Sequence, residues 1–447
     1  MQPVERTGRD VRLHPVGPLR GTVRLPGSKS LTNRYLACTA LADGRSLLRG
    51  ASLSDDAHAM LAALGALGIN AGVEDEAGTL SVVGGRGHIP ETDADLNVGH
   101  AGTAMRFLTA LVALGHGRYR LDGSPRMRQR PIGPLVDGLR ALGALVEYEG
   151  VEGYPPLVVH ARGLAGGEVA FATPPSSQYV SALLMVAPYA QQDVLVSVAG
   201  RLTSRPYVDM TIATMRALGV EVLEGDDQRF VVAASQRYRA GEYTIEPDAT
   251  AATYFWSAAA ITGGAVLVRG LTRASRQGDV GFVDVLAQMG CRVHATAEGL
   301  GVAAPADGRL RGVAVDLNEM PDTVQTLAVT ALFADGPTEI RNVGNLRIKE
   351  TDRIAALATE LGRLGARVTA RADGLTIHPP ARVQPAAIET YDDHRMAMSF
   401  ALAGLCVDGV VIREAGCVSK SFPGFFDALA RLAANADGPP PASGTPE

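Results

Sequence analysis

The chain has 447 residues, which is more than one hydrophobic core usually serves, so its length predicts two or three domains. An apolar fraction of 46% and a charged fraction of 20% are typical of a soluble globular protein, and a net charge of −5 argues against a general nucleic-acid binder. No run of about 18 apolar residues occurs, which excludes a helix that spans a membrane.

The ends of the chain and its cysteines indicate a cellular compartment. The polar N-terminus has no apolar core, so no signal peptide is predicted. Cys38, Cys291, Cys406 and Cys417 form no CxxC pair, which favours a reducing compartment and gives no metal signal. Residues 437–447 are rich in Pro, Gly and Ser and predict a disordered tail. We therefore expect a cytoplasmic protein.

Two kinds of helix alternate along the chain. One kind is rich in Ala and Leu, is apolar on every side and is therefore predicted to be buried. These helices are expected at 36–44, 107–117, 180–191, 254–264, 326–336 and 396–409. The other kind carries more charge and is predicted to lie outside. These helices are expected at 60–68, 135–143, 210–219, 282–290 and 354–365, with a sixth copy at 425–432.

The outer helices reveal an internal repeat. All but the sixth end in Leu-Gly or a similar pair, and Gly68, Gly143, Gly219, Gly290 and Gly365 recur every 71 to 76 residues. Each glycine is expected to take the left-handed conformation after a helix, and an alternating strand such as 367–370 follows. The chain is thus predicted to contain six βαβαββ-like units. Two groups of three suit the usual domain size, with a seam near 242–248 and any site in the cleft between the lobes.

Lysine is unusually rare in this chain. Only Lys29, Lys349 and Lys420 occur, against 39 arginines, and each lies in a dense polar motif. A chain that uses Arg for ordinary surface cations is expected to keep Lys where a compact ammonium is needed. The first motif, residues 26–34, is a Gly-Ser-Lys-Ser turn entering a helix, but its spacing does not fit a phosphate-binding Walker A loop. It predicts an anion site rather than ATP binding.

Further polar motifs stand at the starts of predicted buried helices. In the first half of the chain they are 99–106, 126–132, 176–179 and 204–207, each of which also reads as a helix cap or a solvated loop. In the second half they are 321–322, 349–353 and 392–398, where carboxylates stand beside cations. Their recurrence at the same place in the repeat predicts one cleft lined by Lys, Arg and a few acids. Such a cleft suits a ligand with several negative charges, with the acids moving protons.

From about Leu25 to Arg431 the motifs and their order resemble the EPSP synthases (3-phosphoshikimate 1-carboxyvinyltransferases), a family of enolpyruvyl transferases. The resemblance implies an α/β (α+β) fold, a two-lobed inside-out α/β barrel in which each lobe holds three βαβαββ repeats. It implies that residues 26–246 form an N-terminal lobe on the 3-phosphoshikimate side. Residues 1–25 and 247–447 would form a C-terminal lobe on the phosphoenolpyruvate side, and the lobes would close on binding.

The resemblance also implies the site residues. The 3-phosphoshikimate site would use Ser28, Lys29, Arg34, Ser176, Ser177, Gln178, Ser204, Tyr207, Asp322, Asn345 and Lys349. The phosphoenolpyruvate site would use Lys29, Gly102, Arg106, Arg130, Gln178, Arg353, Arg395 and Lys420. The catalytic residues would be Asp322 as the base for the sugar 5-hydroxyl, Glu350 for the carbon-3 proton, and Lys29. No metal or cofactor is implied, and neither is a nucleic-acid or membrane partner; a monomer is expected.

Two departures and two alternatives accompany this interpretation. His100 stands where the family commonly has Asn, and Phe107 where it commonly has Pro, which leaves sensitivity to the herbicide glyphosate open. A UDP-N-acetylglucosamine 1-carboxyvinyltransferase would carry a loop cysteine near phosphoenolpyruvate, whereas Cys38 falls in a predicted buried helix. A non-catalytic anion-binding paralogue would be expected to lose Asp322 or Glu350, and both are present.

Overall fold

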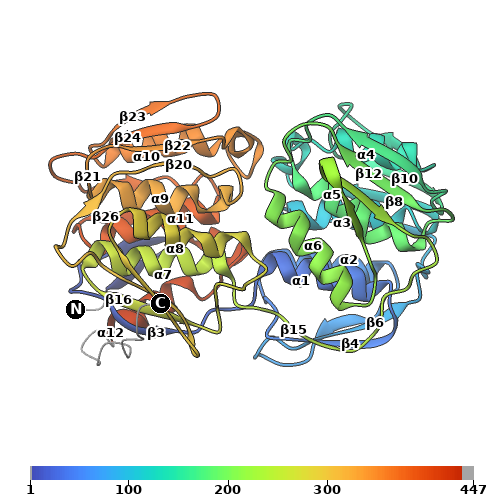
Figure 1. Cartoon of the computed structure of the whole chain (residues 1–447), viewed down its shortest axis with the longest axis horizontal. Coiled ribbons are helices and arrows are strands. Elements are labelled where there is room, and N and C mark those ends of the chain that lie inside the picture. Colours follow the sequence, from blue (N-terminus) through green and yellow to red (C-terminus); the bar gives the residue numbers. More distant parts are fainter. Residues whose placement is uncertain (1–2, 435–447) are drawn as a thin grey trace. The chain divides into compact units, whose positions relative to one another are not determined.

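The computed structural model describes residues 3–434, which form a mixed α/β protein (Figure 1). The chain divides into two compact units. The N-terminal unit is Pro26–Glu246, and the C-terminal unit combines Met1–Leu25 with Pro247–Glu447. The predicted disordered tail, 437–447, lies outside the described residues. Within the described part, no helix is long and apolar enough to cross a membrane.

Three four-stranded sheets of one design form the N-terminal unit. The first two strands of each sheet pair in parallel, and the other two continue antiparallel. The first sheet has the order β15 (Glu242–Thr244), β4 (Asp43–Arg49), β6 (Leu80–Gly85) and β5 (Ala71–Val73). The second has β7 (Asp93–Asn97), β8 (His116–Asp122), β10 (Leu157–Arg162) and β9 (Leu145–Tyr148). The third has β11 (Gly167–Phe171), β12 (Val194–Val198), β14 (Arg229–Val232) and β13 (Leu223–Gly225).

The C-terminal unit repeats this design. Its first sheet has β3 (Arg20–Val23), β16 (Ala265–Arg269), β18 (Gly299–Ala303) and β17 (Arg292–Thr296). Its second has β20 (Ala314–Asp316), β22 (Thr338–Arg341), β24 (Leu375–His378) and β23 (Arg367–Ala370). Its third has β25 (Ala387–Ile388), β26 (Val410–Ile412), β2 (Asp10–Leu13) and β1 (Val4–Thr7). A short pair, β19 (Leu310–Arg311) and β21 (Ala334–Asp335), is added.

Both units complete their sheets with strands from distant parts of the chain. Strand β15 closes the first sheet of the N-terminal unit, and β1, β2 and β3 from the start of the chain enter sheets of the C-terminal unit. The chain enters and leaves the N-terminal unit at neighbouring points, because the Ser28 N–H donates to the Glu246 carbonyl at 2.8 Å. Gly27 is needed there, since a Cβ at this position would lie 1.9 Å from the Gly50 carbonyl oxygen.

Helices fill each unit and the sheets surround them, as Figure 1 shows. The buried helices that contact one another are α1 (Lys29–Ala40), α3 (Gly102–Val112) and α5 (Ser177–Val186) in one unit, and α7 (Ala249–Thr262), α9 (Val324–Thr330) and α11 (His394–Gly404) in the other. The outer, more polar helices are α2 (Asp55–Ala66), α4 (Gly133–Ala141), α6 (Arg205–Ala217), α8 (Phe282–Gln288), α10 (Arg353–Arg363) and α12 (Phe425–Ala434). The predicted α/β fold class, with buried and outer helices alternating, is confirmed. Between these elements stand the short 3-10 helices η1 (Met127–Gln129), η2 (Ala187–Tyr189), η3 (Asp226–Gln228), η4 (Gly278–Gly281), η5 (Pro321–Thr323), η6 (Ala331–Phe333), η7 (Gly344–Ile348) and η8 (Ala415–Lys420).

The five repeat glycines behave as predicted. Each follows an outer helix with a positive φ, from 78° at Gly68 to 101° at Gly290. This left-handed conformation carries little steric cost in glycine, so the residue ends the helix and turns the chain into the next strand.

The predicted helix boundaries were wrong at several starts. Helix α1 begins at Lys29, not at 36, because Ser28 caps it and its first turn is polar rather than apolar. Helices α3 and α11 likewise begin within the polar motifs that precede their apolar stretches, and α7 begins at Ala249, after its cap Asp248, rather than at 254. The helix expected at 326–336 is instead divided into α9 and η6, with η5 before it, and the chain has entered strand β21 by Ala334. Apolar periodicity located only the later part of these helices, whereas the polar motifs at 26–34, 99–106 and 392–398 indicated where α1, α3 and α11 begin.

Candidate active site

The first turn of α1 carries the rare Lys29. The Ser28 hydroxyl accepts the Leu31 N–H at 3.4 Å and so caps the helix. The Lys29 ammonium lies 3.2 Å from a carboxylate oxygen of Asp56, which stands in the first turn of α2 and is 2% exposed. A lysine held against a buried acid at a helix N-terminus has a fixed position, which suits charge stabilisation more than surface solubility.

Arg34 lies one turn further along α1 and is buried. Its guanidinium donates to the Thr211 hydroxyl at 2.7 Å and to the carbonyls of Ser30 and Tyr207, both at 2.9 Å. It also stands over the rings of Phe107 and Tyr207, at 5.4 and 5.9 Å from their centroids. Burial lowers the pKa of Arg34 to about 10. Arg34 therefore ties α1 to α3 and α6.

Helix α3 places Gly102 against Arg130. A Cβ at Gly102 would lie 2.5 to 2.7 Å from three guanidinium atoms of Arg130, so only glycine leaves room for this side chain. Arg106 donates to the carbonyls of Gly102 at 3.1 Å and Pro131 at 2.7 Å. Tyr179 also donates to the Pro131 carbonyl, at 2.7 Å. Arg106 thus fixes the backbone on both sides of the Gly102–Arg130 contact.

The Ser-Ser-Gln motif opens helix α5. The Ser176 hydroxyl accepts the Gln178 N–H at 3.3 Å and caps the helix. Ser177 is buried in the first turn, and the Gln178 amide donates to the Thr103 hydroxyl of α3 at 3.3 Å. The helix starts of α3 and α5, separate in sequence, therefore meet in the N-terminal unit.

The last polar turn of this unit precedes α6. Ser204 adopts a left-handed conformation with φ 57°, and Tyr207 follows in the first turn of the helix. Arg205, by contrast, pairs with Asp209 at 2.6 Å and with Glu224 at 2.7 Å. The Arg205 guanidinium therefore takes part in surface ion pairs of α6.

In the C-terminal unit, Arg353 is the centre of an acid–cation cluster. The guanidinium is 1% exposed and contacts Asp393 at 2.7 and 3.1 Å, Glu350 at 3.0 Å and Asp322 at 3.2 Å. Burial alone would lower the pKa of Arg353, but Asp393, Glu350 and Asp322 together raise it above its usual value. A permanent cation therefore orients three carboxylates.

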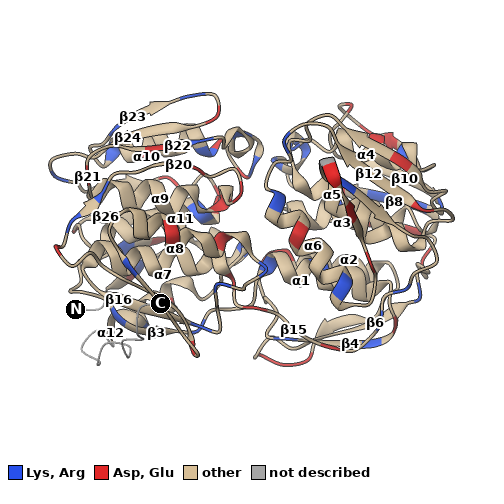
Figure 2. Ribbon diagram, viewed as in Figure 1, with Lys and Arg blue, Asp and Glu red and all other residues tan. Residues whose placement is uncertain are grey.

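Each of the two partly exposed acids has further cationic neighbours. Asp322, in η5, contacts Arg395 at 2.7 Å and Lys349 at 3.9 Å, and its side chain is 14% exposed. Glu350 lies 3.6 Å from the Lys420 ammonium at the end of η8, and its side chain is 11% exposed. Figure 2 shows basic and acidic segments close together beside α11. These acids can exchange protons with a ligand while cations on both sides stabilise negative charge.

Two buried groups lie around this cluster. Tyr254 of α7 receives a contact from Arg395 at 3.5 Å. Asp279 of η4 accepts a hydrogen bond from the Thr250 hydroxyl and is 3% exposed. Burial, with a contribution from Asp322, raises the pKa of Asp279 to about 7. Asn345, in η7, has a buried side-chain oxygen without a hydrogen-bond partner among the described residues.

The structure brings together most of the residues predicted from sequence, within each unit. Lys349, Glu350, Arg353, Asp322, Arg395 and Lys420 form one cluster, whereas Ser28 and Ser176 mainly cap helices. The prediction missed Asp56 and Asp393, which hold Lys29 and Arg353. Asp393 caps α11, and this capping position was the one sequence signal for it.

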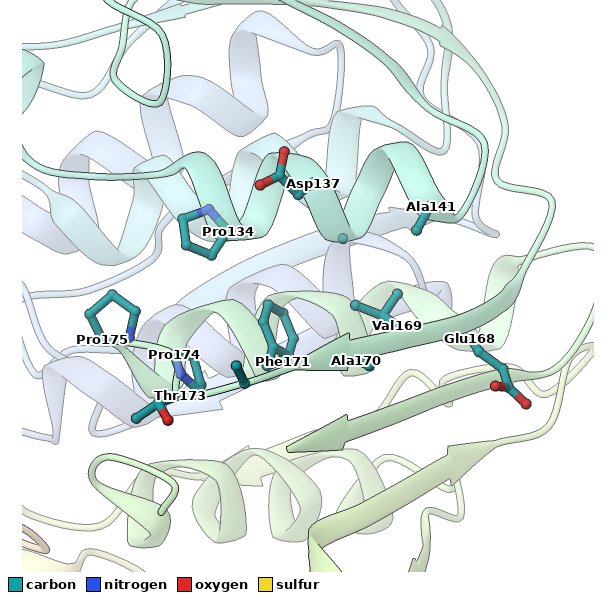
Figure 3. A pocket seen from close by; sticks show the side chains of 12 residues that line it. Pro134, Asp137, Ala141, Glu168, Val169, Ala170, Phe171, Thr173, Pro174 and Pro175 are labelled. Atoms are coloured by element: carbon teal, nitrogen blue, oxygen red, sulfur yellow. The ribbon is translucent and has the colours of Figure 1, made fainter. Parts of the chain in front are cut away.

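Two cavities in the described part of the chain lie elsewhere. One, of about 340 Å³, lies between α4 and β11 and is lined by Pro134, Gly138, Val169 and Phe171 among others (Figure 3). The other, of about 360 Å³, lies between β3 and α12. Neither contains a predicted site residue. In residues 3–434, no group of three or more His, Cys, Asp and Glu side chains is placed to hold a metal ion.

Comparisons with known proteins agree with these arrangements. The family model described as EPSP synthase (3-phosphoshikimate 1-carboxyvinyltransferase) matches residues 13–429. A 3-phosphoshikimate 1-carboxyvinyltransferase from Nostoc sp. is 49% identical over 409 residues, covering 92% of this chain and 96% of the relative. One from Marinomonas sp. is 46% identical over 424 residues, covering 95% and 99%.

A solved structure extends the agreement to three dimensions. The EPSP synthase from Acinetobacter baumannii superposes with a TM-score of 0.79 at 25% identity, covering 95% of this chain and 98% of that one. The relatives named above carry the 3-phosphoshikimate name, which disfavours the UDP-N-acetylglucosamine alternative. The chain therefore belongs to the EPSP synthase family, the 3-phosphoshikimate 1-carboxyvinyltransferases of the shikimate pathway, and the transferase class predicted from its sequence is confirmed.

Proposed function

We propose that the chain transfers the 1-carboxyvinyl group of phosphoenolpyruvate to the 5-hydroxyl of 3-phosphoshikimate, through the acid–cation cluster around Arg353. The observation that carries the residue roles is the shared contact of Asp322 and Glu350 with this one guanidinium, at 3.2 and 3.0 Å. Each acid also has a second cation, Arg395 for Asp322 and Lys420 for Glu350. Two acids held apart by cations suit a reaction in which one proton leaves oxygen and another joins carbon.

The proposed reaction is an addition followed by an elimination. Asp322 accepts the proton of the 5-hydroxyl as its oxygen attacks carbon 2 of phosphoenolpyruvate, and Glu350 delivers a proton to carbon 3. The tetrahedral intermediate then loses phosphate, which leaves with the proton from Asp322, while Glu350 takes a proton back from carbon 3. Lys29 stabilises the developing charge. The cations need not reorganise when charge develops in the transition state, because salt bridges with Asp56 and with the acids of the cluster already fix their positions.

Binding roles follow the two units. In the proposal, 3-phosphoshikimate contacts Ser28, Lys29, Arg34, Ser176, Ser177, Gln178, Ser204, Tyr207, Asp322, Asn345 and Lys349. Phosphoenolpyruvate contacts Lys29, Gly102, Arg130, Gln178, Arg353, Arg395 and Lys420, with Arg106 beside them. Arg34 donates three of its five N–H groups to protein atoms, so two remain for a phosphate. We propose further that the enzyme is a cytoplasmic monomer without a cofactor.

A phosphate-release assay tests the proposal. Purified protein should release phosphate from phosphoenolpyruvate only when 3-phosphoshikimate is present. Release with UDP-N-acetylglucosamine instead, or with no acceptor, would contradict the assigned substrate. A glyphosate titration of the same assay decides whether His100 and Phe107 alter sensitivity to that herbicide.

A further inference from the structure

A strained turn leads into helix α11. Tyr391 and Asp392 both have left-handed backbone conformations, with φ of 55° and 54°, which are uncommon outside glycine. Such residues persist only where surrounding contacts hold them. The next residues are Asp393, which contacts Arg353, and Arg395, which contacts Asp322. The turn therefore determines where these two side chains of the cluster point.

Glu360 of helix α10 holds this turn. Its carboxylate is fully buried, and one oxygen accepts the Tyr391 hydroxyl at 2.7 Å. The other oxygen accepts the Glu389 N–H at 3.2 Å and a guanidinium N–H of Arg363 at 3.2 Å. Burying a carboxylate destabilises the fold unless hydrogen-bond donors compensate its charge. Two of the three donors to Glu360, the Glu389 N–H and the Tyr391 hydroxyl, belong to the loop that precedes α11.

Helix α10 therefore contacts the loop before α11 at two points along its length. Arg353, its first residue, contacts Asp393, and Glu360 contacts Tyr391 seven residues later. Seven residues are close to two helical turns, so both side chains leave α10 on one face, about 10 Å apart along its axis. Of the two strained residues, Tyr391 is itself the residue that contacts Glu360, and Asp392 lies between it and Asp393.

The Tyr391 hydroxyl is a dependable donor in this arrangement. Burial, together with its bond to Glu360, raises the pKa of Tyr391 to about 12, so the hydroxyl keeps its proton at neutral pH. The residue as a whole is 40% exposed, so its ring adds little to the core. A contact that contributes little burial but fixes a strained turn is better explained by orientation than by bulk stability.

We propose that Glu360 is a positioning residue, which holds the turn of Tyr391 and Asp392 so that the first turn of α11 stays oriented toward Arg353. This inference rests on the proposed function, in which Arg353 and Arg395 bind phosphoenolpyruvate. Glu360 would thus affect the binding of phosphoenolpyruvate without contacting either substrate.

The test is the steady-state kinetics of Glu360→Gln. Glutamine keeps one acceptor oxygen, but its amide nitrogen cannot accept the Glu389 N–H. The KM for phosphoenolpyruvate should rise about tenfold, while the KM for 3-phosphoshikimate stays within twofold. Tyr391→Phe, which removes only the hydroxyl, should raise the phosphoenolpyruvate KM about threefold. This second variant still tests the inference if Glu360→Gln fails to fold. Glu339→Gln, on an exposed ion pair with Arg371 at 2.6 Å, is the matched control and should change neither constant.

Two outcomes would overturn the inference. If Glu360→Gln and Tyr391→Phe lower the melting temperature but leave the phosphoenolpyruvate KM unchanged, Glu360 has a structural role alone. Arg395→Lys separates this failure from that of the proposed function. An increase of the phosphoenolpyruvate KM in Arg395→Lys without one in Glu360→Gln refutes only the positioning role. No increase in Arg395→Lys refutes the binding role of Arg395, and the inference with it.

Discussion

Replacing Gly102 with alanine should separate substrate binding from folding. A Cβ at this position would lie 2.5 Å from Nη1 of Arg130 and 2.7 Å from Cζ and Nη2, whereas ordinary contact begins at 3.4 Å. The guanidinium must therefore retreat by about 0.9 Å, the difference between these two distances. Arg130 is 6% exposed, so it cannot swing freely into solvent. A charge-assisted hydrogen bond of about 2.8 Å would lengthen to about 3.7 Å, which is no longer a hydrogen bond.

The expected effect follows from that one lost bond. A hydrogen bond to a charged group contributes about 1.5–3 kcal/mol, which corresponds to an increase of roughly 10- to 150-fold in the KM for phosphoenolpyruvate. Helix α3 itself should not be weakened, because alanine favours a helix by up to about 1 kcal/mol over glycine and Gly102 has no left-handed backbone. Phosphate release at saturating 3-phosphoshikimate, with phosphoenolpyruvate varied, measures the KM, and a melting curve measures folding.

Gly65→Ala is the matched control for this substitution. Gly65 also lies in a helix, α2 of the same unit, and a Cβ there would meet no atom within 4 Å. It should leave both KM values unchanged. If Gly102→Ala leaves the phosphoenolpyruvate KM within twofold of wild type, Arg130 either does not bind this substrate or moves without cost, and the reasoning fails.

Three further predictions concern other parts of the site. Glu350→Gln should lower kcat by about 10²- to 10⁴-fold while calorimetry finds both substrates bound as in wild type; near-normal turnover would refute its proton role. Burial raises the pKa of Asp279 to about 7, above its unfolded value of about 4, so its contribution to stability is full below about pH 4 and is lost as the pH rises through 7. The difference in melting temperature between wild type and Asp279→Asn should show this fall across that range, and the exposed Asp284→Asn should not. Arg34→Lys should lower the free energy of unfolding in urea by about 2–4 kcal/mol, because three separate guanidinium nitrogens make the three hydrogen bonds and a single ammonium nitrogen cannot reach all three acceptors; equal stability would contradict the bridging role of this guanidinium.

The sequence predicted the repeat well because burial leaves a periodic trace. An all-apolar helix followed by an amphipathic one is a local pattern that recurs six times, and in five of the six copies the amphipathic helix ends in glycine. Candidate site residues could also be named from the sequence, because polar and charged side chains stood at the starts of predicted buried helices. The apolar pattern begins several residues after the start of α1 at Lys29, so the polar motif at 26–34, and not the apolar stretch, indicated where this helix begins.

Pairings between distant residues could not be predicted in this way. Lys29 and Asp56 stand on successive helices, and Arg353 and Asp393 are 40 residues apart, so their contacts depend on how whole repeats pack. Glu360 was less visible still. It is one acid on an outer helix whose exposed side carries a single charge, Arg363, and only the burial of its carboxylate and its hydrogen bonds to Tyr391 and the Glu389 N–H distinguish it.

The packing of the three buried helices explains why separate motifs of the C-terminal unit form one cluster. Thr253, Thr326 and Ser399 recur 73 residues apart, and their hydroxyls meet at 3.1 and 3.5 Å in the core. This contact places α7, α9 and α11 at one level. Asp322 and Arg395 each precede their hydroxyl residue by four positions, about one helical turn, so they reach the same end of the helix layer. Their 2.7 Å salt bridge is thus a consequence of the repeat spacing, and a change of that spacing by even one residue would rotate one partner away by about 100°.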